Sequence, residues 1–181
     1  VNMLCENGTV LVLPGTYNDN VSAEKKTVNI YGTGKDICII RSYDNDYFNP
    51  TLEISAGSVS NISFLAMNDG RGIIENGAYA VHSDYNYSYG RNLKFINCNI
   101  YSEYNAGAGI GLRGAGSLAF SGCTITGYDK GMFVHDSDDP NVGGNQYLYL
   151  ENNVITGKTG NLAMVIASQD VDNANVTVKA N

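Results

Sequence analysis

The feature that most constrains the fold is an internal repeat of 25 to 30 residues. Residues 92–102, 117–127 and 147–157 share one pattern, in which two apolar residues, each followed by a spacer, precede a turn residue, a Cys or Asn, a second spacer and an Ile. The Cys or Asn position falls at Cys98, Cys123 and Asn153, and at Asn181 in a partial fourth copy, with spacings of 25, 30 and 28 residues. Such a period is the length of one coil of a parallel β-solenoid.

Each copy alternates apolar and polar residues with period two, which indicates half-buried β-strands. Asn97, Gly122 and Asn152 occupy the same place between two apolar steps. Asn and Gly tolerate the left-handed backbone conformation of a sharp bend. Weaker copies occur at residues 10–12, 28–30 and 62–67. We therefore expect an all-β fold, a parallel β-helix of about six to seven coils.

Composition excludes several classes of protein. The 181 residues carry a net charge of -7, which argues against nucleic-acid binding because that needs basic patches. No apolar run approaches the ~20 residues of a membrane span, so no membrane partner is expected. We expect residues 1–181 to be a single β-helix domain, a fragment of a longer protein. The last residue stands at a ladder position, so further coils, another domain or a homotrimer partner would cover it.

The four cysteines show neither the density of a disulfide framework nor a CxxC pair for zinc. Cys98 and Cys123 would stack one coil apart with their side chains pointing the same way, which suits a disulfide badly. We expect buried free thiols in an inward ladder that continues through Asn153 and Asn181.

The sequence also carries resemblances. GTVLVLPGTY at residues 8–17, followed by KTVNIYGTG at residues 26–34, resembles the first coils of the pectin-lyase-like superfamily. That resemblance implies a right-handed parallel β-helix that handles polysaccharides. AVHSD at 80–84, FINC at 95–98, GIGLR at 109–113 and VHDS at 134–137 are similar to β-helical tail or receptor-binding proteins of phages infecting gut Gram-positive bacteria. This similarity implies a place on the virion surface or outside the cell.

A candidate site follows from placing the second strand of each coil in register. His82, Arg113 and His135 would then form one column on successive coils, about 4.8 Å apart. The loops that follow add Asp84 and Asp136. Aromatic faces stack on sugar rings while polar groups bond hydroxyls, so this flank predicts a carbohydrate site. The ligand-binding candidates are His82, Arg113, His135, Tyr85, Tyr87 and Tyr89.

Three roles remain open for these residues. The first is glycan contact, with Arg113 pairing a uronate or phosphate. The second is catalysis, in which His82 or His135 is the general acid or base, oriented by Asp84 or Asp136. The third is purely structural, because a His beside an Asp or Ser is often a strand-end residue held by its loop.

The enzyme alternative is a polysaccharide lyase, esterase or hydrolase. The motifs of the superfamily's enzymes are missing: no Trp exists for a methylesterase pattern, and no pair of inward carboxylates stands out for hydrolysis. Asp136, Asp138 and Asp139 are a weak candidate for Ca²⁺, and no other cofactor or metal is expected. The favoured hypothesis is a glycan-recognising module, with bacterial surface polysaccharide as its partner.

Overall fold

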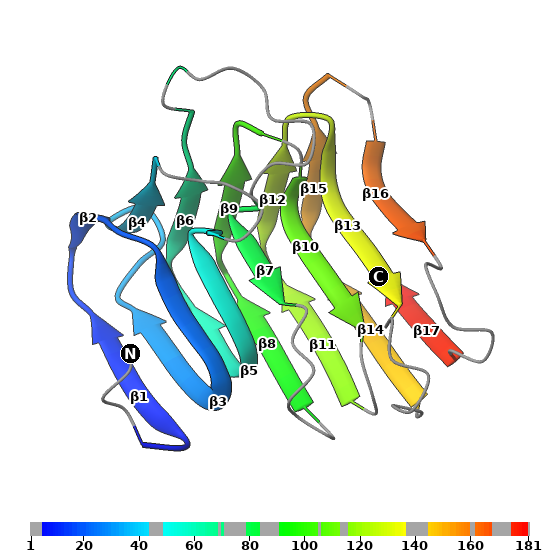
Figure 1. Ribbon diagram of the computed structural model, residues 1–181, viewed down its shortest axis with the longest axis horizontal. Helices are drawn as coiled ribbons and strands as arrows, with labels where there is room; N and C mark the ends of the chain where they lie inside the picture. Colours follow the sequence, from blue (N-terminus) through cyan, green and yellow to red (C-terminus); the bar gives the residue numbers. More distant parts are fainter. Residues whose placement is uncertain are drawn as a thin grey trace.

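The structure is a computed structural model that describes residues 5–43, 49–68, 70, 79–83, 91–104, 106–112, 116–136, 145–159, 162–167 and 175–180. Within these ranges every regular element is a β-strand, and every pairing between strands is parallel. The strands wind as successive coils stacked along one axis, from the blue amino-terminal end to the red carboxyl-terminal end (Figure 1). No helix in the described ranges is long and apolar enough to span a membrane.

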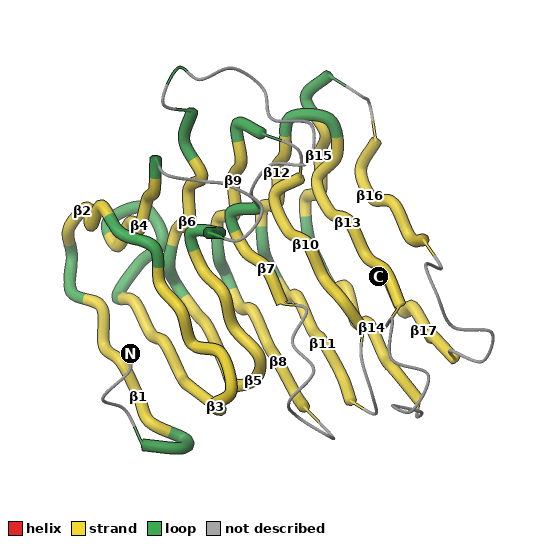
Figure 2. The backbone as a smooth tube through the Cα atoms, in the orientation of Figure 1, coloured by secondary structure: helices red, strands yellow, loops and turns green. Residues whose placement is uncertain are grey.

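Each coil has three faces (Figure 2). The first face contains β1 (Gly8–Val12), β8 (Arg91–Ile96), β11 (Gly116–Ser121), β14 (Asn145–Glu151) and β17 (Asn175–Ala180). The second face contains β2 (Gly15–Asn18), β4 (Cys38–Ser42), β6 (Ser63–Ala66), β9 (Asn99–Ser102), β12 (Thr124–Gly127) and β15 (Val154–Gly157). The third face contains β7 (Val81–Ser83), β10 (Ala106–Leu112), β13 (Lys130–Asp136) and β16 (Leu162–Ala167).

Two longer strands, β3 (Val21–Gly32) and β5 (Leu52–Ser60), join the third face of one coil to the first face of the next. The amino-terminal part of β5 pairs with β7, while its carboxyl-terminal part pairs with β8. The described strands therefore form six coils and the first strand of a seventh. The parallel pairing of strands on successive coils confirms the β-helix predicted from the repeat, and the number of coils agrees with the predicted six to seven.

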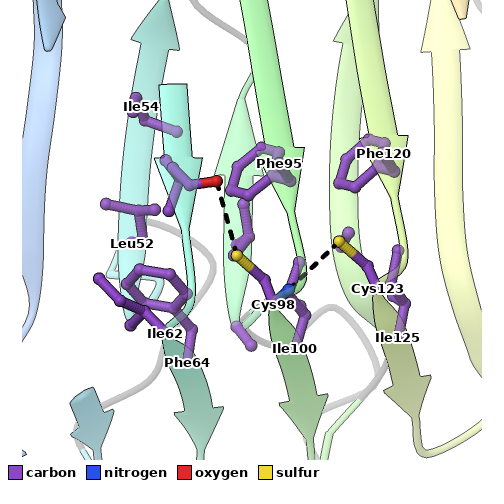
Figure 3. Close-up of a cluster of buried hydrophobic side chains, with 14 of the residues drawn as sticks. Leu52, Ile54, Ile62, Phe64, Phe95, Cys98, Ile100, Phe120, Cys123 and Ile125 are labelled. Atoms are coloured by element: carbon purple, nitrogen blue, oxygen red, sulfur yellow. Dashed lines mark hydrogen bonds between the residues drawn. The ribbon is translucent and has the colours of Figure 1, made fainter. Parts of the chain in front are cut away.

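The core lies between the three faces and is built from stacked rows of inward side chains (Figure 3). On the first face Phe95 and Phe120 are fully buried, with ring centroids 4.9 Å apart and planes only 4° from parallel. On the second face Phe64, Ile100 and Ile125 occupy one row, since each pairs in register with the next. The apolar positions of the repeat thus fill the interior, as their alternation predicts.

The corner between the first and second faces explains the turn residue of the repeat. Asn61, Asn97, Gly122 and Asn152 all have positive φ, between 50° and 64°. The predicted left-handed turn is confirmed at 97, 122 and 152, and Asn61 adds an earlier coil. The Asn97 side-chain amide donates a 2.8 Å hydrogen bond to Asn61 Oδ1, so adjacent corners are also joined by side chains.

The next position forms the predicted inward ladder. Cys98 and Cys123 are buried free thiols, as expected, and Cys38 lies in the same column two coils earlier. The Cys98 backbone N–H points at Cys123 Sγ, 3.5 Å away (Figure 3). The pKa of the Cys98 thiol is raised far above its ordinary value, first by its hydrogen bond with Cys123 and then by burial.

Asn153 continues this ladder by satisfying backbone groups of the preceding coil. Its Oδ1 accepts a hydrogen bond from the Cys123 backbone N–H, and its Nδ2 donates to the Phe120 carbonyl, both at 2.9 Å. A half-buried amide is acceptable beside an apolar ladder when both ends are satisfied in this way. Asn181, the last predicted member, lies outside the described residues.

Candidate functional site

His82 and His135, predicted to stand in one column with Arg113, are not in register with each other. His82 pairs with Gly109, and Gly109 pairs with Phe133, so His82 lies level with Phe133. His135 instead pairs with Gly111 on one side and Ala167 on the other. The two histidines are therefore separated by β10 and offset by two residues. A two-residue slip keeps every side chain on its predicted face, so alternation alone cannot detect it.

Most of the other predicted site residues lie outside the described ranges. These are Asp84, Tyr85, Tyr87, Tyr89, Arg113, Asp138 and Asp139. His135 and Asp136 have described backbone at the end of β13, but their side chains are not described. The ligand-binding roles and the weak Ca²⁺ site therefore stay predictions. Among the described residues no cluster of three or more His, Cys, Asp or Glu could hold a metal ion.

His82 is the predicted residue whose surroundings the structure defines. Its Nδ1 lies 2.7 Å from Glu53 Oε2, and both side chains are only 12% exposed. The two residues pair in register on β7 and β5, on the outer side of the third face. The imidazole N–H donates to a carboxylate that can only accept, which fixes the orientation of the ring.

Tyr79 covers this pair. Its ring stacks on the His82 imidazole, with centroids 5.3 Å apart and planes 7° from parallel. The same ring lies over Gly109, where an added Cβ would come within 2.6 Å of it. Only glycine at this position lets the tyrosine lie flat on the sheet. Tyr79 is buried, so His82 is packed on one face and hydrogen-bonded at its edge.

Sequence reasoning missed both Glu53 and Tyr79. Glu53 was detectable, because it is the outward residue between the inward pair Leu52 and Ile54, one coil before His82. Tyr79 lies before β7 and outside the repeat pattern, so no periodic signal marks it. Chemically, the arrangement is an oriented carboxylate–histidine pair under an aromatic cover.

A second cluster lies on the outer side of the first face. Tyr147 and Tyr149 alternate outward on β14, with ring centroids 6.2 Å apart and planes within 17° of each other. Tyr149 is 37% exposed. The neighbouring strand places short side chains in register with them, Ser117 beside Tyr147 and Ala119 beside Tyr149. Two parallel tyrosine rings thus stand next to a low strip of small residues.

Lysines stand on both sides of this cluster. Lys94 on β8 pairs with Ala119, and Lys179 on β17 pairs with Tyr149. Lys179 Nζ lies over the Tyr149 ring, 5.8 Å from its centroid. We call Tyr147, Tyr149, Ser117, Ala119, Lys94 and Lys179 the tyrosine face.

A similar contact occurs on the second face, where Lys158 Nζ lies 4.4 Å from the centroid of the half-buried Tyr101 ring and also contacts its hydroxyl. Among the described residues, no second ring stacks parallel to Tyr101, whereas Tyr147 and Tyr149 stack on each other. Tyr101 and Lys158 are therefore suitable reference positions for experiments on the tyrosine face.

Comparison with solved structures places the architecture in a known class, the right-handed parallel β-helix. One similar solved structure is "Pectin methylesterase from Carrot", with a TM-score of 0.56 and 16% sequence identity over 98% of this chain. The chain spans 66% of that protein, just under two thirds of its length. At this identity the likeness shows the fold alone. No protein-family model and no curated protein matches the sequence.

Proposed function

We propose that this β-helix is a glycan-recognising module. The observation that carries the proposal is the tyrosine face, where Tyr147 and Tyr149 present near-parallel rings on the outside of the solenoid. Flat aromatic surfaces bind the apolar faces of sugar rings, while neighbouring polar groups bond the hydroxyls. Repeated strands present such groups at a regular spacing, which suits an extended polymer better than a small molecule.

Two further points support a carbohydrate ligand. The structural neighbour is by its title a pectin methylesterase, a protein of the same fold that acts on a polysaccharide. The resemblance to β-helical phage proteins supports the finer form of the proposal. In that form the chain is part of a tail or receptor-binding protein that contacts a bacterial surface polysaccharide from the virion surface, with further domains or a homotrimer completing the assembly.

The test is glycan binding by the full chain and by two matched variants. Bacterial cell-wall polysaccharides are immobilised, and binding is measured for the unmodified chain, for Tyr149→Ala and for Tyr101→Ala. A stacking contact of an aromatic ring is worth on the order of 1 kcal/mol, so Tyr149→Ala should weaken binding about fivefold or more. Tyr101→Ala should bind as the unmodified chain does. Equal binding by both variants, or no binding by the unmodified chain to any polymer, would refute the proposal.

An enzymatic function is the second candidate, and the His82–Glu53 pair is the observation that favours it. A carboxylate-oriented imidazole is the arrangement of a general base or acid. Tyr79 argues the other way, because it occupies the sheet surface next to the imidazole. Incubation with pectin, teichoic acid and capsular glycans should be followed by assays for unsaturated products, reducing ends and released methanol. Turnover that disappears in His82→Ala supports an enzyme, whereas binding without turnover excludes one for those polymers.

A further inference from the structure

We propose that the tyrosine face takes a phosphate-bearing glycan, an inference that rests on the proposed function and specifies its ligand. Lys94 and Lys179 make no ion pair with any described carboxylate, and the Lys179 ammonium lies over the ring of Tyr149, 5.8 Å from its centroid. Glu151 is the carboxylate described on the same strand, and it accepts a hydrogen bond from Ser121. Two cations without an ion-pair partner among the described residues, on one face of a chain with net charge -7, mark a local site for an anion.

The order of the strands shows where the ligand would lie. Lys179 covers the side of the Tyr149 ring that faces β17, so the opposite side faces β11 and the short side chain of Ala119. Lys94 stands one strand further on. Strands are about 4.8 Å apart, which puts the β8 and β14 backbones roughly 10 Å from each other. A sugar ring stacked on Tyr149 above Ala119 would bring an acidic substituent to Lys94.

The second lysine extends the site along the solenoid axis. β8 and β17 are three strand spacings apart, so the backbones bearing Lys94 and Lys179 are separated by roughly 14 Å. The ligand that satisfies both is a polymer with acidic groups at intervals, bridged by neutral rings that stack on the tyrosines.

The identity of the cations favours phosphate over carboxylate. Both described cations of the face are lysines, whose compact ammonium groups bind phosphate oxygens as point charges. Planar carboxylates are recognised best by the guanidinium fork of arginine, which makes two parallel hydrogen bonds. A phosphodiester presents its charge on oxygens that can be approached from any side. The lysine pair therefore fits a phosphodiester-linked or phosphate-substituted polysaccharide.

The test compares three immobilised polymers: glucose-substituted poly(glycerol phosphate), polygalacturonate and dextran. The full chain should bind the phosphate polymer best. Lys94→Gln and Lys179→Gln should each weaken that binding about threefold to tenfold at low salt, and the loss should shrink at high salt because exposed charges are screened. Lys158→Gln is the matched control and should leave binding unchanged. Circular dichroism of each variant confirms that the β-helix is intact.

The outcomes separate this inference from the proposed function. Tyrosine-dependent binding that is as strong for dextran or polygalacturonate, or that ignores both lysine substitutions, overturns the phosphate inference and leaves glycan recognition standing. Absence of binding to all three polymers and to cell-wall polysaccharides overturns both. Preferential, lysine-dependent and salt-sensitive binding of the phosphate polymer supports both.

Discussion

Gly57 provides the sharpest test of how tightly the coils are stacked. It lies in β5, where Val28 of the preceding coil and Leu93 of the following coil flank it in register. Its φ is 121°, a backbone region that is almost exclusive to glycine. A Cβ added there would lie 1.9 Å from the Val28 carbonyl oxygen and 2.7 Å from its carbon. Gly57→Ala should therefore force two coils apart.

The magnitude follows from two contributions. An unfavourable backbone conformation costs about 1–3 kcal/mol. Each ladder hydrogen bond lost as β5 moves away from β3 costs about 1 kcal/mol more. Because the Cβ would collide with backbone rather than with a flexible side chain, rotamer changes cannot relieve the contact. We expect Gly57→Ala to lower the free energy of unfolding by about 3 kcal/mol or more.

Gly122→Ala is the matched control. Gly122 also has positive φ, 64°, but a Cβ there would have no atom within 4 Å. Only the conformational cost of the left-handed region remains, about 1–2 kcal/mol. Urea unfolding followed by circular dichroism gives both values, provided the m-values stay the same. A Gly57→Ala variant as stable as Gly122→Ala, or within about 0.5 kcal/mol of the unmodified chain, would refute the coil packing described here.

Three further predictions concern the interior. Phe120→Ala removes one ring of the buried stack with Phe95 and should cost about 3–5 kcal/mol in urea unfolding, against little change for Ser117→Ala on the outside of the same strand. Asn153→Ala leaves two backbone groups of the preceding coil without their partners and should cost about 1–3 kcal/mol by the same assay; a neutral effect would contradict the ladder. Iodoacetamide should label one thiol of the native chain, the exposed Cys5, and all four after unfolding, as counted by mass spectrometry. Because the pKa of Cys98 is raised, that thiol stays protonated and should remain unlabelled when the pH rises from 7 to 9; labelling of Cys98 under those conditions would contradict its environment.

Much of the fold was predictable because each coil repeats the same local chemistry. The turn at Asn97 and Gly122 needs a left-handed residue, and the next position of both repeats is a buried cysteine. Both positions recur once per coil, so they appear as a period in the amino-acid sequence. The bends within β3 and β5 have no such signature, because one continuous strand serves two faces. The place of Cys38 in the ladder was also hidden, since the coil between it and Cys98 has Ile62 at that position.

The candidate site was less predictable for a physical reason. The third face has no large outward side chain on β10, where Gly109 and Gly111 stand beside the histidine-bearing strands. Without a large side chain to mark the register of β10, the alternation pattern fits two registers of the neighbouring strands that differ by two residues. The partners of His82 come from a preceding coil and from a segment outside the repeat. The tyrosine face combines residues more than 80 positions apart, and only the stacking of four coils brings Lys94 onto the same face as Tyr149 and Lys179.

The central claim is that a glycan is held on the outside of β14. The most direct measurement uses a chain in which its 13 tyrosines carry a ¹³C label, titrated with the bound polymer and followed by NMR. Assignment by single Tyr→Phe substitutions identifies the signals of Tyr147 and Tyr149. We expect these two signals to shift and broaden in proportion to saturation while that of Tyr101 stays unchanged. Binding that leaves both signals unmoved, or that shifts Tyr101 instead, would contradict the account.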